Sequence, residues 1–87
     1  MQINTLTIPY NSSDVNDLQM LHGFTTYHMD MEERKVTVIS GDGWKFQYEG
    51  ESEIDLTQDL VITIPAMKSH KIKIGTTDLV VTIETGT

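Results

Sequence analysis

Hydrophobic residues recur at every second position over much of this chain, which is the spacing of strands that bury one face. The first run extends from Ile3 to Ile8, and Pro9 ends it because proline has no N–H for a strand ladder. The run Leu60–Ile64 is closed in the same way by Pro65. Short runs of this kind, separated by turn residues, are typical of an all-β domain.

One segment has a different period and predicts a helix. Asn11–Asp14 is rich in residues that cap helix N-termini, and Leu18 and Leu21 follow at a spacing of three. Gly23 stands where a helix would end. We therefore predict one short helix near residues 14–22, with both leucines facing inward.

After this helix the period changes to two, and three such runs lie between residues 25 and 49. Gly41-Asp42-Gly43 separates the second run from the third and predicts a hairpin, because glycine reaches positive φ without steric cost. In the third run Trp44, Phe46 and Tyr48 form an aromatic face. The pattern predicts a three-stranded meander over about residues 25–49 with this face in the core.

The last third of the chain adds a final hairpin, with Lys71–Ile74 and Leu79–Glu84 on either side of a Gly-containing turn. The fold expected is mainly β: a small antiparallel sandwich or partly open barrel of six to seven strands, with one short helix. Residues 1–87 form a single domain. The expected core comprises Val38, Trp44, Phe46, Leu60, Ile62, Ile64, Ile72, Leu79, Val81 and Ile83.

The net negative charge of the chain argues against two classes of binding partner. The 87 residues carry 13 acids and 6 bases, a net charge of −7, which argues against direct binding to nucleic acid or to an anionic membrane. Residues 1–59 hold a balance of −8 and residues 60–87 a balance of +1. There is no cysteine and no apparent signal peptide or spanning segment, so a cytoplasmic protein is expected.

No group of residues in the sequence forms a catalytic motif. His28 and Asp30 share one face of a predicted strand and could supply two metal ligands, but a catalytic zinc site needs three. The favoured interpretation is a solvent-facing side of that strand. Ser69 and His70 point to opposite faces and cannot act as a nucleophile–base pair there. We expect no enzyme activity, no catalytic residue, no metal site and no cofactor.

The most unusual feature is a row of acids at every second position, Glu49, Glu51, Glu53 and Asp55, which we call the acidic strip. In an extended chain such acids lie about 6.6 Å apart on one face. Phosphates along a nucleic acid are separated by about 6–7 Å, so the strip could imitate them unless Gly50 bends it. Alternatively, its charges protect a sheet edge against aggregation. The predicted partner-binding residues are the acidic strip and Asp59, and the basic residues Lys68, His70, Lys71 and Lys73 could form ion pairs with the strip.

These features favour a non-enzymatic binding protein that occludes a basic surface on a protein that handles nucleic acid. In size and charge it is similar to the small acidic inhibitors that bacterial viruses use against host nucleases and defence complexes. The alternative is a structural β protein that assembles into oligomers, such as a virion or tail component, through exposed strand edges and Met29, Met31 and Met67. A small-ligand-binding barrel is a third possibility.

Overall fold

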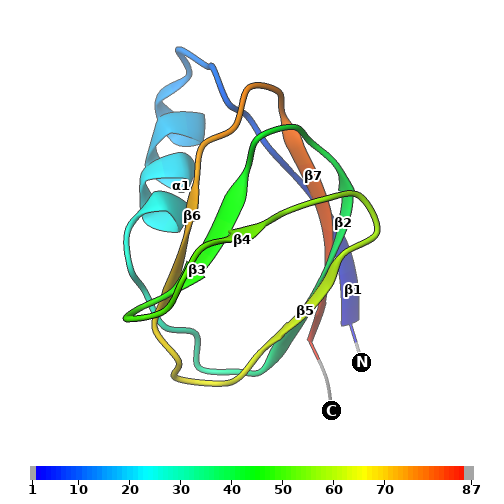
Figure 1. Cartoon of the computed structure of the whole chain (residues 1–87). Helices are drawn as coiled ribbons and strands as arrows, with labels where there is room; N and C mark the ends of the chain where they lie inside the picture. Colours follow the sequence, from blue (N-terminus) through cyan, green and yellow to red (C-terminus); the bar gives the residue numbers. More distant parts are fainter. Residues whose placement is uncertain (1, 86–87) are drawn as a thin grey trace.

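The computed structural model describes residues 2–85, which form two antiparallel sheets and one helix (Figure 1). One sheet has the strand order β1-β7-β2-β5 and the other has the order β4-β3-β6, and the described residues form no closed barrel. The prediction of a mainly β fold with one short helix is confirmed. The elements are β1 (Gln2–Ile8), α1 (Val15–Thr25), β2 (Arg34–Ser40), β3 (Lys45–Tyr48), β4 (Ile54–Asp55), β5 (Val61–Ile64), β6 (His70–Lys73) and β7 (Leu79–Thr85).

The core lies between the two sheets, where alternate side chains of each strand meet. Val38 of β2 and Leu79 and Val81 of β7 face Phe46 of β3 and Trp44, which directly precedes β3, and all five are buried. Of the ten predicted core residues, Ile64 is also buried and the remaining four are half-buried at the margin of the core: Leu60, Ile62, Ile72 and Ile83. Three further buried side chains complete it: Ile8, Leu21 and Leu56.

The helix begins where the sequence predicts but ends three residues later. The Asp14 carboxylate accepts hydrogen bonds from the first free N–H groups of α1, at 2.8 and 3.3 Å. The helix continues through Gly23 to Thr25, whose hydroxyl donates to the Leu21 carbonyl at 2.9 Å. Leu21 is buried as predicted, whereas Leu18 is 47% exposed, so the prediction that both leucines face inward is wrong. No helix within residues 2–85 is long and apolar enough to cross a membrane.

The predicted meander over residues 25–49 is wrong in two respects. Residues 26–33 form no strand; a single β-bridge between His28 and His70 is their only ladder contact among the described residues. In addition, β2 pairs with β5 and β7 instead of β3, so Gly41–Gly43 carries the chain from one sheet to the other. A tight glycine turn specifies a reversal of direction, but it does not specify whether the two strands pair.

The connection from β6 to β7, also predicted as a hairpin, crosses between the sheets like the Gly41–Gly43 turn. The two crossings touch: the Thr76 amide donates to the Asp42 carbonyl at 2.8 Å. Gly75 lies so close to this carbonyl that an added Cβ would stand 2.1 Å from its oxygen. Nε1 of Trp44 donates to the Thr77 carbonyl at 2.6 Å. The two crossings and the tryptophan thus fix one end of the sandwich.

Candidate functional site

The acidic strip does not form one extended row. The chain turns at Glu49 and Gly50, where φ of Gly50 is 82° and the Glu51 amide donates to the Tyr48 carbonyl at 3.0 Å. Glu49 therefore lies at the end of β3, whereas Asp55 belongs to β4, which runs back beside it. The expected pitch of about 6.6 Å along a single strand is lost, because Gly50 bends the row.

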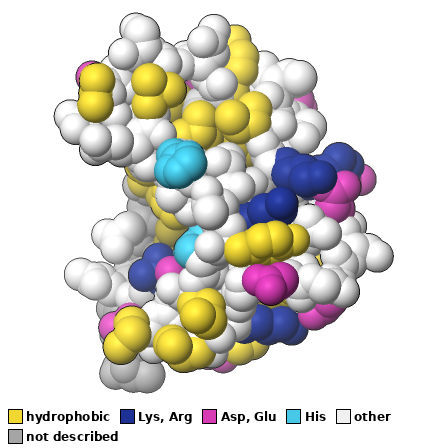
Figure 2. All heavy atoms as spheres, turned by 90° about the vertical axis from the view of Figure 1, so that its left-hand side faces the viewer, with side chains coloured by type: hydrophobic (Ala, Val, Ile, Leu, Met, Phe, Trp, Pro, Cys, Tyr) yellow, Lys and Arg dark blue, Asp and Glu magenta, His cyan; other side chains and the backbone are white. Residues whose placement is uncertain are grey.

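Basic side chains from neighbouring strands partner the strip. Lys45 lies directly opposite Asp55 in the β3–β4 ladder and also opposite Lys73 of β6, which places these side chains on the outer face of the sheet. The Glu49 carboxylate accepts a hydrogen bond from the Ser69 hydroxyl at 2.9 Å. Figure 2 shows basic and acidic side chains side by side on this part of the surface. The ion pairs are Lys45–Asp55, Lys68–Glu51 and Lys73–Glu53.

These ion pairs compensate the negative charge of the acidic strip. A hydrogen bond from Lys73 lowers the pKa of Glu53, and the hydrogen bond to Asp55 raises the pKa of Lys45. The four acids share their face with Lys45, Lys68, Lys71 and Lys73, so this surface has no net charge. The pairs are exposed, and exposed pairs of this kind contribute little to stability. The surface around the strip is therefore neutral, but its lysines bind the strip carboxylates only weakly.

The net charge of −7 resides elsewhere. Outside the strip, seven carboxylates have no basic partner within ion-pair distance among the residues that the structure describes: Asp14, Asp17, Glu32, Glu33, Asp42, Asp59 and Asp78. Asp42 and Asp78 line one hollow together with Tyr10 and the turn residues Thr57 and Gln58, which precede Asp59. We call Asp42, Asp59 and Asp78 the acidic end. Asp42 and Asp78 lie in the two crossings that touch, and Asp59 lies in the connection from β4 to β5, where its amide donates to the Val38 carbonyl at 2.8 Å.

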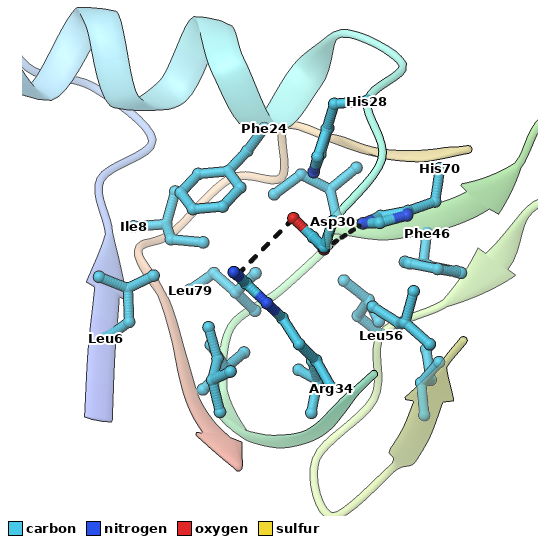
Figure 3. Close-up of a pocket in the computed structure, with 16 residues that line it drawn as sticks. Leu6, Ile8, Phe24, His28, Asp30, Arg34, Phe46, Leu56, His70 and Leu79 are labelled. Carbon is cyan, nitrogen blue, oxygen red and sulfur yellow. Dashed lines mark ion pairs between the residues drawn. The ribbon is translucent and has the colours of Figure 1, made fainter. Parts of the chain in front are cut away.

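A second group of titratable residues lies near the opposite end of the core. The His28 and His70 backbones exchange two hydrogen bonds, each 3.0 Å long, which places their rings side by side with centroids 4.4 Å apart. Asp30 reaches between His70 and Arg34 (Figure 3). Its Oδ2 lies 3.4 Å from Nε2 of His70, and its Oδ1 lies 3.7 Å from Nη1 of Arg34. We call His28, Asp30 and His70 the histidine–aspartate cluster.

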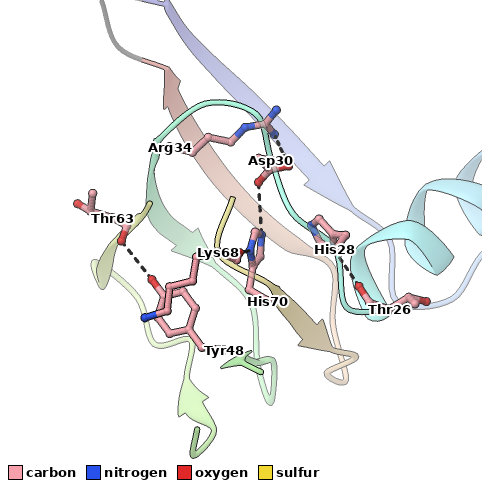
Figure 4. Close-up of polar contacts among 8 residues, drawn as sticks. All are labelled: Thr26, His28, Asp30, Arg34, Tyr48, Thr63, Lys68 and His70. Carbon is pink, nitrogen blue, oxygen red and sulfur yellow. Dashed lines mark hydrogen bonds and ion pairs between the residues drawn. The ribbon is translucent and has the colours of Figure 1, made fainter. Parts of the chain in front are cut away.

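Backbone carbonyls orient both imidazole rings. Nδ1 of His28 lies 2.8 Å from the Thr26 carbonyl, and Nδ1 of His70 lies 2.8 Å from the Lys68 carbonyl (Figure 4). Each Nδ1 therefore carries a proton, which leaves Nε2 as the lone-pair atom of the neutral ring. Burial lowers the pKa of His70 below its ordinary value, although the Lys68 carbonyl and Asp30 act in the opposite direction.

The cluster borders an apolar cavity of about 70 Å³ between the sheets. Phe24, Phe46 and Leu56 contribute to its wall, and the cluster and Arg34 supply its polar side (Figure 3). The side chains of Asp30 and His70 are 14% and 5% exposed. The cluster is thus largely desolvated, which strengthens any electrostatic interaction made there.

The prediction of a solvent-facing side for His28 and Asp30 is wrong, because their segment is a loop folded over the core. The sequence analysis did not identify His70 as their neighbour, although it correctly separated His70 from Ser69. The one available signal was alternation: His70 lies two residues before Ile72 and so shares the inward face of β6. Nothing local predicts its contact with Asp30.

Comparison with protein-family models, with curated proteins and with solved structures finds no match to this chain.

Proposed function

We propose that this chain is a non-enzymatic, cytoplasmic binding protein that docks through its carboxylates onto a basic surface of a protein that handles nucleic acid. Occupation of that surface would exclude the nucleic acid and inhibit the partner. An inhibitor of a host nuclease or defence complex, of the kind encoded by bacterial viruses, is the form that size and charge suggest.

The distribution of charge is the observation that supports this proposal. Five of the six Lys and Arg side chains are held in ion pairs, and the sixth, Lys71, lies over the Tyr27 ring at 4.5 Å. The unpartnered carboxylates therefore determine the long-range field, and such a field accelerates encounter with a basic partner. Within this field Asp42 and Asp78 line a hollow together with the exposed Tyr10, and Asp59 directly follows the lining residues Thr57 and Gln58 in the chain.

The acidic end is accordingly the proposed contact, and the acidic strip is a secondary one. Three of the four strip carboxylates must exchange a lysine of this chain for a partner's lysine or arginine, which gains little beyond the exposed pair that is given up. The carboxylates of the acidic end make no such exchange. The primary contact therefore lies away from Glu49, Glu51, Glu53 and Asp55, and Asp59 remains part of it.

The test is capture of proteins from a bacterial lysate on the immobilised chain, followed by elution with salt or with duplex DNA. We expect a captured protein that binds DNA, that competing duplex displaces, and that elutes well below about 1 M salt, where the screening length is about 3 Å. A captured protein that resists both salt and duplex DNA would contradict the proposal, and so would the lack of any DNA-binding protein in the eluate.

One observation favours the alternative of an assembling structural protein. β1 is a seven-residue edge strand whose sequence, QINTLTI, carries no charge and no proline, and Ile3 is 61% exposed. Uncharged edges of this length pair readily with other strands. Sedimentation distinguishes the two proposals: a monomer at micromolar concentration supports the inhibitor, whereas salt-insensitive rings or filaments support assembly.

A further inference from the structure

The ligand chemistry of the histidine–aspartate cluster suits a transition-metal ion. His28, Asp30 and His70 each offer one ligand atom, and these atoms lie within 4.8 Å of one another. Two imidazole nitrogens and one carboxylate oxygen are a common set for three-ligand zinc sites, whereas calcium and magnesium prefer oxygen alone.

One separation inside the cluster also fits, and the remaining ligand atom lies within 4.8 Å of both. Zinc binds histidine nitrogen and carboxylate oxygen at about 2.0–2.2 Å, so two tetrahedral ligands stand about 3.3–3.5 Å apart. The separation between Nε2 of His70 and Oδ2 of Asp30 is 3.4 Å. With Nδ1 protonated, the Nε2 atom of neutral His70 has no proton to donate to Asp30. Two acceptors therefore face each other in a largely buried site, which is an arrangement that a shared cation stabilises.

The groups that contact the three candidate ligands orient them as in known metal sites. Metal-bound histidines usually donate the other ring N–H to a carbonyl or carboxylate, which fixes the ring and its tautomer. Here the Thr26 and Lys68 carbonyls take that role for His28 and His70. Arg34 lies against Oδ1 of Asp30 and leaves Oδ2 directed toward His70 (Figure 4). The His28 ring makes its hydrogen bond through Nδ1, and its Nε2 has no hydrogen-bond partner within residues 2–85.

We propose that His28, Asp30 and His70 bind one divalent ion of the zinc class through the two Nε2 atoms and one Asp30 oxygen. A fourth coordination position stays open to water or to a small ligand, because three protein ligands do not complete a tetrahedron. The ion would also connect the loop that carries His28 and Asp30 to β6, and so join two segments that otherwise share one β-bridge.

The experiment is a calorimetric titration of the full chain, first treated with a chelator, with zinc chloride. We expect saturable binding of one ion per chain and a higher melting temperature with zinc, because a ligand that binds only the folded state stabilises it. Cobalt(II) should bind at the same site and give the intense visible absorption of a tetrahedral complex.

The variants separate a specific site from surface binding. His28→Asn keeps a donor for the Thr26 carbonyl but removes Nε2, and His28 is only half-buried, so the fold should persist. Affinity should fall at least about 100-fold, since even the loss of a group that only hydrogen-bonds to a metal ligand costs about 10–100-fold. Asp30→Asn provides a second, independent loss of a ligand. His22→Asn, which alters the exposed histidine on α1, is the matched control and should bind zinc normally.

Two results would overturn the proposal. One is the lack of saturable zinc and cobalt binding by the wild-type chain. The other is wild-type affinity in both His28→Asn and Asp30→Asn, or loss of binding in His22→Asn, since either pattern places the ion elsewhere.

Discussion

Burial of the His70 side chain makes the stability of the fold depend on pH. Its pKa is lower in the folded chain than in the unfolded chain, where it is about 6.5. The unfolded state therefore takes up the proton at higher pH than the folded state, and protonation favours unfolding. The groups around the ring are His28, Asp30, Arg34 and the Lys68 carbonyl, and they leave the direction of the shift unchanged.

We expect the free energy of unfolding of the metal-free chain to be constant above about pH 6.5 and to fall as the pH drops below that value. Urea unfolding at a series of pH values, in the presence of a chelator, measures this. His70→Asn should flatten the dependence between about pH 7 and 5.5, whereas His22→Asn should leave it intact. Stability that rises on acidification would show that His70 is protonated in the fold.

Two glycines give opposite predictions for the same substitution. An added Cβ at Gly75 would stand 2.1 Å from the Asp42 carbonyl oxygen and 2.7 Å from the Trp44 amide nitrogen. Gly75→Ala should therefore destabilise the chain by about 3 kcal/mol or more, because backbone on both sides must move. Gly23 lies in α1 with nothing within 4 Å, so Gly23→Ala should stabilise by about 0.5–1 kcal/mol. Thermal unfolding of both variants checks the pair; equal effects would contradict the close packing of the two crossings.

At the level of elements, Trp44 shows that local alternation predicts well which side chains of a strand region are buried. Its alternation with Phe46 placed it in the core, and it is 1% exposed. Trp44→Ala should cost about 3–5 kcal/mol. Trp44→Phe should cost less, since it keeps most of the packing and loses the hydrogen bond to the Thr77 carbonyl. Chemical denaturation gives both values, and the native emission should be blue-shifted; a red-shifted, freely quenched emission would show that the indole is not buried.

The sequence pattern did not predict which strands pair with one another. The alternation of β2, β3, β6 and β7 identified each strand, but both connecting turns were interpreted as hairpins, whereas each crosses between the sheets. A turn sequence constrains a few dihedral angles, and the choice between pairing and crossing depends on how the whole core packs. The prediction of a strand over residues 26–33 is wrong for a related reason. Tyr27, Met29 and Met31 alternate as in a strand, yet all three are exposed, and the segment pairs with β6 only through the bridge between His28 and His70.

The candidate sites depend on these long-range contacts. Asp55 lies near Lys45 because β3 and β4 form a hairpin, and Asp30 lies near His70 because the loop after α1 folds over β6. Neither contact can be derived from spacing along the chain. The sequence therefore predicted which residues carry charge, but it did not predict which charges are compensated.

For the whole molecule, the proposed function implies that the acids without a basic partner are the ones that would attract a partner protein. Neutralising the acidic strip leaves four lysines on that face, whereas neutralising the acidic end removes carboxylates that have no basic partner among the described residues. Replacement of Asp42, Asp59 and Asp78 by Asn should leave stability level or slightly higher, because like-charge repulsion is relieved. Asn also tolerates the positive φ of 71° at Asp59. Thermal unfolding measures the change; a large loss would show that the acidic end holds the fold together.

The most direct test of the account compares these two variants for binding to the captured DNA-handling partner over a series of salt concentrations. The triple variant Asp42→Asn, Asp59→Asn and Asp78→Asn should associate more slowly, show a weaker salt dependence and lose most of the affinity. The strip variant Glu49→Gln, Glu51→Gln, Glu53→Gln and Asp55→Asn removes one more charge but should lose less, because three of its four carboxylates already have lysine partners. Wild-type binding by the triple variant, together with loss of binding in the strip variant, would contradict the account and return the contact to the acidic strip.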